Sequence, residues 1–235
     1  MKLEIGYNDD FEIRREFYQT QTPCKFSILF ISDLHLNGFS KDLIDNLKNQ
    51  IEALNPSILL LGGDYVDSKK GFPFFKEFLS FLLQRKNNYA IAGNHDFFYG
   101  LDKIKNEIIK NKVIWMDKNI ERLNLGNINI YISNSRMAET NKATDFSILL
   151  QHNPKNIDKT KNKFNLAFAG HLHGCQFVFW DNNKGLYPGR HFYKWNILKT
   201  KIGDTYYLVS KGLGDTLPIR YNCKKDIIFV EVFGK

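Results

Sequence analysis

The feature that most constrains this chain is the segment from Leu59 to Asp67, which reads LLLGGDYVD. Three leucines after Pro56 form a short apolar run that ends abruptly at two glycines, a pattern typical of a buried parallel strand followed by a loop. Asp64 then lies at the carboxyl end of a strand. Open α/β sheets bind ligands at this edge, because the loops converge there while the strands hold them in place.

Two further apolar segments end in the same way. Residues 26–32 (FSILFIS) precede Asp33, and residues 89–92 precede GNHD, in which Asn94 is the second residue. Asp33, Asp64 and Asn94 are each about 30 residues apart, the length of a strand, a crossover helix and the next strand. We therefore expect parallel strands whose polar ends meet in one cleft. Its carboxylate, imidazole and amide groups suit borderline divalent cations such as Mn²⁺, Fe²⁺ and Zn²⁺.

Composition favours a single cytoplasmic domain over residues 1–235. The chain is 43% hydrophobic, enough for a full core, and no segment resembles a linker. No apolar run reaches the roughly 20 residues that span a bilayer, and the N-terminal segment is too polar for a signal peptide. Three cysteines without paired spacing fit a reducing compartment. The net charge of +8 favours anionic partners, but the lysines are scattered, so general solvation is the simpler interpretation.

The order of predicted elements indicates an α/β fold with two sheets packed face to face and helices outside. Residues 3–19 are expected to form a leading hairpin or an edge strand. Helices are expected over 40–54, 72–83 and 101–109. The Phe-rich helix over 72–83 is interpreted as a crossover helix, with a lipid-binding lid as the alternative. Strands are expected at 113–116, 119–124, 128–133, 146–151, 164–169, 176–180, 205–210 and 227–233, with a short helix at 154–163.

Five of the six histidines lie where strands are predicted to end. They are His35, His95, His152, His171 and His173. The last two, in AGHLHG, can project the same way from one extended segment. A lone histidine is usually an ordinary hydrogen-bonded residue, but this pair, added to three strand ends that carry Asp or Asn, indicates a metal site.

These blocks resemble those of the calcineurin-like metallophosphoesterase superfamily. SDLH, GDYVD, GNHD, the histidine of LLQHNP, and GHLH occur in the family's order and spacing over about residues 26–175. The resemblance implies a four-layer αββα sandwich of two mixed β-sheets flanked by helices. It also implies two divalent metal ions, with Mn²⁺ expected first and Fe or Zn as alternatives. The implied ligands are Asp33, His35 and His173 for one ion, Asn94, His152 and His171 for the other, and Asp64 bridging both.

The implied activity is hydrolysis of phosphodiester or pyrophosphate bonds by attack of a metal-bridging hydroxide. By the same resemblance, His95 stabilises the transition state or protonates the leaving oxygen, and Asp96 orients the His95 imidazole. Two interpretations of Asp67 stay open: it steadies the loop or a ligand histidine, or it caps a turn.

Details of the blocks point to a branch of the family. Ser68-Lys69 after the second block and the Asp that ends GNHD disfavour the protein serine/threonine phosphatases, which have Arg-Gly and Glu there. The segments GHLHGCQ, YPGRHFY and KGLGDTLPIR resemble a bacterial branch that includes membrane-associated phosphodiesterases and a UDP-2,3-diacylglucosamine pyrophosphatase of lipid A synthesis. That branch commonly has glycine in place of Cys175 and an N-terminal membrane segment, which we do not expect here. That pyrophosphatase and a non-catalytic metal-binding homologue are the alternative functions.

Specificity is expected from the variable segments. Arg190 and Arg220 are candidate phosphate contacts, since guanidinium groups bind phosphate bidentately. Segments 72–83, 97–100 and 187–195 are apolar and aromatic, which favours a phosphorylated small molecule or lipid with a large apolar or stacking group over a simple monoester. The alternative for 187–195 is a hairpin packed on the sheet. Nucleic acid is not an expected partner, and peripheral contact with the inner membrane stays open.

Overall fold

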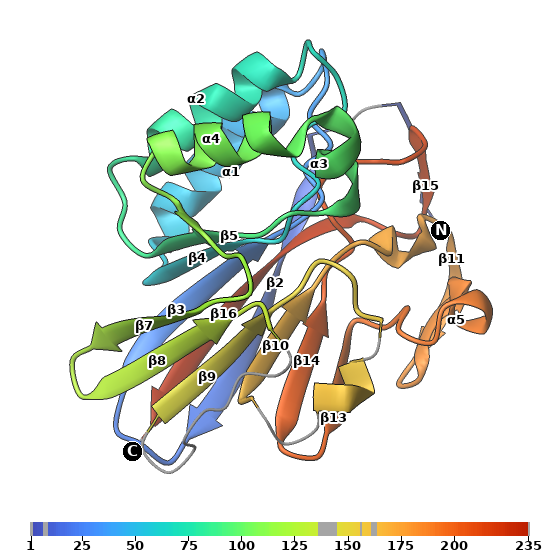
Figure 1. Cartoon of the computed structure of the whole chain (residues 1–235). Coiled ribbons are helices and arrows are strands. Elements are labelled where there is room, and N and C mark those ends of the chain that lie inside the picture. The colour runs from blue at the N-terminus through green and yellow to red at the C-terminus, as the bar shows by residue number, and fades with distance from the viewer. Residues whose placement is uncertain (1, 7–8, 136–144, 156, 161–163, 235) are drawn as a thin grey trace.

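Two six-stranded mixed sheets pack face to face in the computed structural model, which describes residues 2–6, 9–135, 145–155, 157–160 and 164–234 (Figure 1). In order, the first sheet contains β2 (Phe11–Thr20), β16 (Lys225–Gly234), β3 (Lys25–Ile31), β4 (Ile58–Leu61), β5 (Asn88–Ala90) and β6 (Ile114–Trp115). The second contains β13 (Lys199–Ile202), β14 (Thr205–Val209), β10 (Leu166–Ala169), β9 (Asp145–Leu150), β8 (Ile128–Ser133) and β7 (Ile120–Leu125). Strands β3 to β6 are parallel, as the repeated spacing predicts.

Alternation along the buried strands separates two cores. Ile28 and Phe30 of β3 point into the layer between the sheets, whereas Leu29 and Ile31 point toward the helices. Successive side chains in a strand face opposite sides, so a strand buried on both faces is apolar throughout. The continuous run of leucines in β4 has this origin, and it confirms the predicted buried strand.

Three helices cover the outer face of the first sheet (Figure 1). They are α1 (Lys41–Leu54), α2 (Phe72–Leu82) and α4 (Leu101–Lys110). Phe75 and Phe78 of α2 are fully buried in the core between these helices and the sheet. The Phe-rich segment is therefore a crossover helix, and the alternative of a lipid-binding lid does not apply.

The outer face of the second sheet has a thinner cover. The 3-10 helix η1 (Ile157–Thr160) packs there with Phe164 and Tyr207 in a small separate core. The predicted αββα order of layers is confirmed, but the fourth layer is a single short turn in the described part of the chain. None of the described helices has the length and apolar character needed to cross a membrane.

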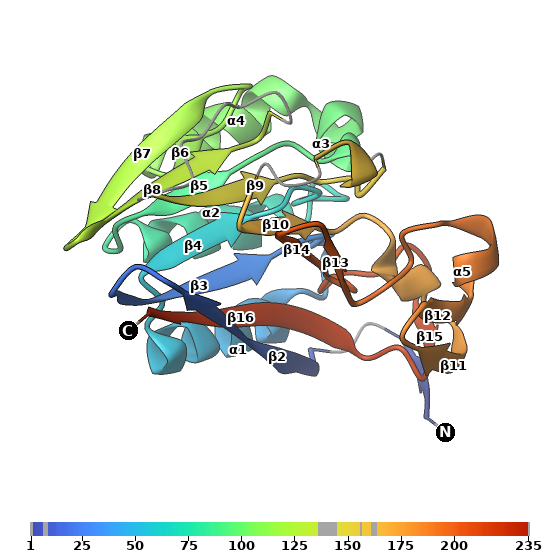
Figure 2. The same cartoon turned by 90° about the horizontal axis from the view of Figure 1, so that it is seen from below.

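The N-terminal segment decides between the two alternatives expected for residues 3–19. β1 (Leu3–Ile5) pairs with β15 (Ile219–Tyr221), while β2 is the edge strand of the first sheet and runs parallel to β16. Of the two alternatives, the edge strand is confirmed and the leading hairpin does not form. β1 and β15 lie at the same end of the sandwich as β11 (Val178–Asn182), β12 (Gly185–Pro188) and α5 (Gly189–Phe192) (Figure 2).

Candidate metal centre

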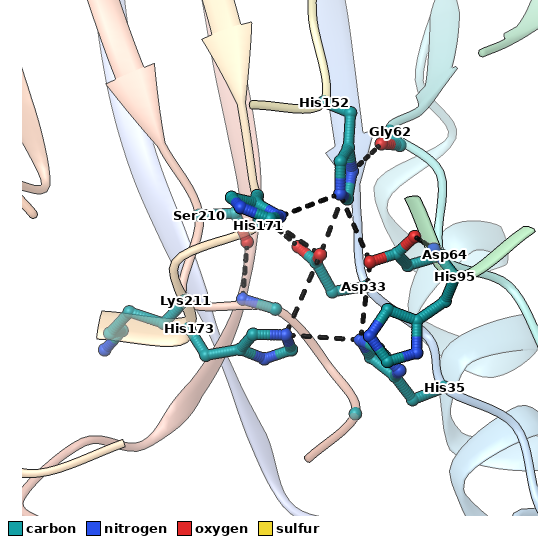
Figure 3. A network of polar contacts seen from close by, with 12 residues as sticks. Asp33, His35, Gly62, Asp64, His95, His152, His171, His173, Ser210 and Lys211 are labelled. Atoms are coloured by element: carbon teal, nitrogen blue, oxygen red, sulfur yellow. Dashed lines mark hydrogen bonds and ion pairs between the residues drawn. The ribbon is translucent and has the colours of Figure 1, made fainter. Parts of the chain in front are cut away.

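The predicted ligands meet at one edge of the two sheets, where the strands end. The first sheet supplies Asp33 and His35 after β3, Asp64 after β4, and Asn94 at the start of α3 (Asn94–Tyr99) after β5. The second sheet supplies His152 after β9, and His171 and His173 after β10. Figure 3 shows the histidines arranged around the two aspartates. The site therefore depends on how the two sheets pack against each other.

The backbone at this edge is held in an unfavourable conformation. Positive φ angles between 44° and 73° occur at five of the predicted ligands: Asp33, His35, Asp64, His171 and His173. Such angles cost on the order of 1 kcal/mol or more for a residue with a side chain, and they cluster at functional sites. A side chain at Gly93 would collide with Asp64, so glycine there lets the ends of β4 and β5 approach closely. The sharp turns point several polar groups into one small volume.

The donor atoms form two groups that share the space around Asp64. In the first, Nε2 of His173 lies 3.2 Å from Nε2 of His35 and 3.8 Å from Oδ1 of Asp33. In the second, Nε2 of His152 lies 3.1 Å from Oδ2 of Asp64 and 3.2 Å from Nδ1 of His171. All donor atoms of each group lie within 4.8 Å of one another, so each could hold a metal ion.

The hydrogen bonds of His152 fit a cation in the second group. Its Nδ1 is 2.8 Å from the carbonyl oxygen of Gly62 and can only donate to it. In the neutral ring Nε2 then carries a lone pair and no proton. It nevertheless faces two other acceptors, Oδ1 of Asn94 at 2.9 Å and Oδ2 of Asp64 at 3.1 Å. A cation among the three would satisfy them all. Without one a proton takes its place: burial opposes the charge, but Asp64 and Asp33 raise the pKa of His152 to about 9.

His35 has a matching arrangement in the first group. Nδ1 of His35 lies 2.8 Å from Oδ1 of Asp67, and its Nε2 faces Nε2 of His173. Burial is the largest single influence and lowers the pKa of His35. The hydrogen bond to Asp67, together with the negative charges of Asp67, Asp33 and Asp64, raises the pKa overall. Burial and the neighbouring His35 and Arg220 hold the pKa of His173 well below its usual value. A neutral His173 has a lone pair available for a cation.

Asp67 occupies the place next to His95 that was expected for Asp96. The Asp96 carboxylate is fully buried and accepts backbone N–H groups of Gly93, Asp64 and Tyr65 at 2.8 to 2.9 Å. Asp67, not Asp96, contacts the His95 imidazole, at 3.2 Å from Nδ1. The predicted pairing of Asp96 with the His95 ring is therefore wrong, since Asp96 ties together the ends of β4 and β5.

His95 lies at the mouth of the site. Its backbone N–H donates to Oδ1 of Asp64 at 2.7 Å, and its partly exposed ring borders a cleft of about 360 Å³. With His35 and Asp64 its ring nitrogen also forms a third group close enough to hold a metal. Geometry alone leaves His95 suited to proton transfer or to coordination.

A family model described as calcineurin-like phosphoesterase matches residues 26–175, which carry all the predicted ligands. This chain belongs to the calcineurin-like phosphoesterase family. Among its relatives, "Phosphodiesterase YaeI" of Escherichia coli K12 is 26% identical over 97% of this chain and 90% of that protein. "Uncharacterized metallophosphoesterase YkoQ" of Bacillus subtilis is 26% identical over 88% of this chain and 84% of that protein.

Solved structures of the same family share the fold. The calcineurin-like phosphoesterase YfkN from Bacillus subtilis superposes with a TM-score of 0.52 at 13% identity, over 86% of this chain and 90% of that one. The NAD nucleotidase NadN of Haemophilus influenzae gives 0.51 at 15% identity, over 82% of this chain and 46% of that one. At this identity the likeness extends to the fold alone.

The cleft of this family member is lined by residues that sequence reasoning missed. Beside the predicted ligands lie Gln176, Tyr193 and Thr216, and Cys175 also borders it. Tyr193 belongs to the aromatic and basic run 187–195, which was the one available signal. Gln176 and Thr216 lie in GHLHGCQ and KGLGDTLPIR, segments that indicated a branch of the family but not a place in the cleft.

The structure brings neither predicted phosphate-binding arginine to the cleft surface. The guanidinium of Arg190 donates to the carbonyl oxygens of Lys184 and Lys194. Arg220 is 2% exposed, pairs with Asp215, and its Nη2 lies 3.5 Å from Nδ1 of His173. These positions correct the expected role: Arg190 fastens the β12–α5 segment, and Arg220 lies behind His173 rather than facing a substrate.

Proposed function

We propose that this chain is a phosphoesterase with two metal ions that hydrolyses phosphodiester or pyrophosphate bonds, with phosphodiesters preferred. The observation that carries the proposal is the position of Asp64. Its Oδ2 lies 3.8 Å from Nε2 of His35 in one donor group and 3.1 Å from Nε2 of His152 in the other. A carboxylate between two such groups is suited to bridge two cations.

The residues present fit two divalent ions, with Mn²⁺ expected first and Fe or Zn as alternatives. Asp33, His35 and His173 would hold one ion, and Asn94, His152 and His171 the other. When bound, the ions would supply electrophilic activation of the phosphoryl group and a lower pKa for a water molecule. Imidazole, carboxylate and amide donors match these borderline ions better than Ca²⁺, which takes oxygen ligands.

The chain's own residues supply positioning and proton transfer. Asp67 holds His35 and His95 through their Nδ1 atoms, which leaves Nε2 of each ring free to act. Nε2 of His95, at the mouth of the cleft, is placed to give a proton to the leaving oxygen. Asp96 fixes the loops that present Asp64, so the donors need little rearrangement when substrate binds.

Space on both sides of the site supports a phosphodiester. The cleft beside Asn94 is one hollow, and a second, of about 400 Å³, borders His152. Nε2 of His152 lies 2.9 Å from Oδ1 of Asn94, so both hollows border the second donor group. A phosphate with two substituents could place one in each, whereas a monoester would use only one.

A substrate comparison tests this function. The protein is stripped with a chelator, reconstituted separately with Mn²⁺, Zn²⁺ and Fe²⁺, and assayed on bis(p-nitrophenyl) phosphate, p-nitrophenyl phosphate and UDP-2,3-diacylglucosamine. We expect no turnover without metal and a higher kcat/KM for the diester than for the monoester. Preference for the monoester would contradict the diester assignment, and turnover in the stripped protein would contradict the metal mechanism. Cleavage of the lipid substrate above the aryl diester would favour the pyrophosphatase.

A further inference from the structure

Among the described residues that line the hollow beside His152, His152 is the only predicted metal ligand. The hollow is bounded by α3 and α4 on one side, by β6 and the residues after it, and by the ends of β8 and β9. Its volume of about 400 Å³ is in the range of small-molecule sites. Because His152 belongs both to its wall and to the second donor group, the hollow lies next to the metal centre.

Two aromatic side chains border this hollow. Phe97 of α3 is 63% exposed and belongs to none of the described hydrophobic cores. Trp115 at the end of β6 packs against the helix-side core, has Nζ of Lys105 5.9 Å from its ring centroid, and lines the hollow together with Met116. A phenyl ring and an indole in the same lining provide two surfaces on which a flat ring can stack. The fold leaves Phe97 uncovered where a substrate could cover it.

Side-chain amides add hydrogen-bonding capacity. Asn134 donates from Nδ2 to the carbonyl oxygen of Met116 at 2.9 Å, and its buried Oδ1 has no partner among the described residues. Gln151 and Asn153, on either side of His152, also line the hollow. Amides offer both a donor and an acceptor, the combination that matches the edge of a nucleobase.

Charge argues for an uncharged ring rather than a second phosphate. Asp102 and Asp117 balance Lys105 and Lys118 in the lining, and Lys105 lies 4.0 Å from Asp117. A balanced lining does not favour an extra anion. An acyl chain would leave the amides unused and would bury their polar atoms at a cost.

We propose that this hollow binds the nucleobase of a nucleotidyl phosphodiester, with Phe97 and Trp115 as the stacking residues. The inference rests on the proposed phosphodiesterase function and deepens it, since it names the substrate class. The metal centre then holds the phosphate, and the cleft lined by Tyr193 and Thr216 accepts the leaving group.

The test compares two diesters with the same leaving group. Thymidine 5′-(p-nitrophenyl phosphate) and methyl p-nitrophenyl phosphate are assayed with the Mn²⁺-loaded protein. We expect Phe97→Ala and Trp115→Ala to lower kcat/KM for the nucleoside diester by about 5- to 150-fold, the range for loss of one base-stacking contact. The methyl diester should change less than twofold. Equal losses on both substrates, or none on either, would overturn the proposal.

Two controls distinguish the nucleobase site from the proposed phosphodiesterase function. Trp180→Ala removes a half-exposed indole that stacks on Tyr187 outside the hollow, and both kcat/KM values should stay unchanged. Binding of thymidine 5′-monophosphate and of ribose 5-phosphate, measured by calorimetry, needs no turnover. We expect at least about tenfold tighter binding of the nucleotide, lost in the exposed-surface variant Phe97→Ala. Failure of all diester cleavage with this preference intact would refute the phosphodiesterase function only, whereas equal binding of both ligands would refute the nucleobase site.

Discussion

Oδ1 of Asp67 lies 2.8 Å from Nδ1 of His35, and this contact fixes which nitrogen of a predicted metal ligand faces the site. The same oxygen lies 3.2 Å from Nδ1 of His95. One carboxylate therefore orients both a predicted ligand and the predicted proton donor. Of the two interpretations that the sequence allowed for Asp67, the geometry favours the one in which it steadies a ligand histidine.

Asp67→Asn should weaken metal binding. The neutral amide oxygen accepts hydrogen bonds more weakly than the carboxylate oxygen that now contacts both imidazoles. Metal affinity should therefore fall by about 10- to 100-fold, as is usual when a partner of a metal-bound histidine is changed. Titration of Mn²⁺ into the stripped protein measures this. Asp181→Asn, on an exposed strand away from the site, is the matched control. Unchanged affinity in Asp67→Asn would show that His35 needs no such partner.

His95→Ala should keep both metal ions and lose catalysis. If His95 transfers a proton and does not bind metal, kcat should fall by about 10²- to 10⁴-fold while metal content stays at the wild-type value. Elemental analysis alongside steady-state kinetics separates the two roles. Loss of an ion would instead assign His95 to the group that it forms with His35 and Asp64.

Asp96→Ala should destabilise the fold itself. Its carboxylate accepts three buried backbone N–H groups, and removal leaves these donors without partners, at a cost of at least about 3 kcal/mol. Urea unfolding of the metal-free protein measures the loss. Asp67→Asn should show much less destabilisation under the same conditions. Wild-type stability in Asp96→Ala would mean that the ends of β4 and β5 hold together without it.

The stability of the metal-free protein should depend on pH. Burial opposes charging His152, but Asp64 raises its pKa to about 9, above the ordinary 6.5. The folded state then binds a proton that the unfolded chain releases, so this contribution is complete below about pH 6.5 and is lost as pH rises through 9. Thermal unfolding in chelator should show Tm falling across this window. Added Mn²⁺ should remove the dependence, and a flat Tm in chelator would contradict it.

The site could be predicted from the sequence because its donor residues directly follow strands that are recognisable from a few consecutive apolar residues. Asp33, Asp64 and Asn94 could be placed from spacing alone, since parallel strands end at one edge. The role of Asp96 could not, because its partners come from the end of β4, and that close approach depends on packing. The position of Arg220 is likewise set by a buried pair with Asp215 near the C-terminal end of the chain.

Long-range pairing explains why the sequence left two alternatives open for residues 3–19. Residues 3–19 alternate as a hairpin would, but β2 pairs with β16 from the opposite end of the chain, and β1 pairs with β15. Alternation of polar and apolar residues indicates that one face of a strand is buried, but it does not indicate which strand it pairs with. The Phe-rich helix α2 shows the converse, since its broad apolar surface was compatible with a lid until burial of Phe75 and Phe78 decided the matter.

The most direct test of a site with two ions bridged by Asp64 is the metal content and turnover of Asp64→Ala beside the wild type. Both proteins are stripped, reconstituted with Mn²⁺, desalted, and measured by elemental analysis and with bis(p-nitrophenyl) phosphate. The wild type should hold two ions per chain, and Asp64→Ala should hold one or none and show no measurable turnover. An Asp64→Ala protein with two ions and normal turnover would contradict the bridging role on which this account rests.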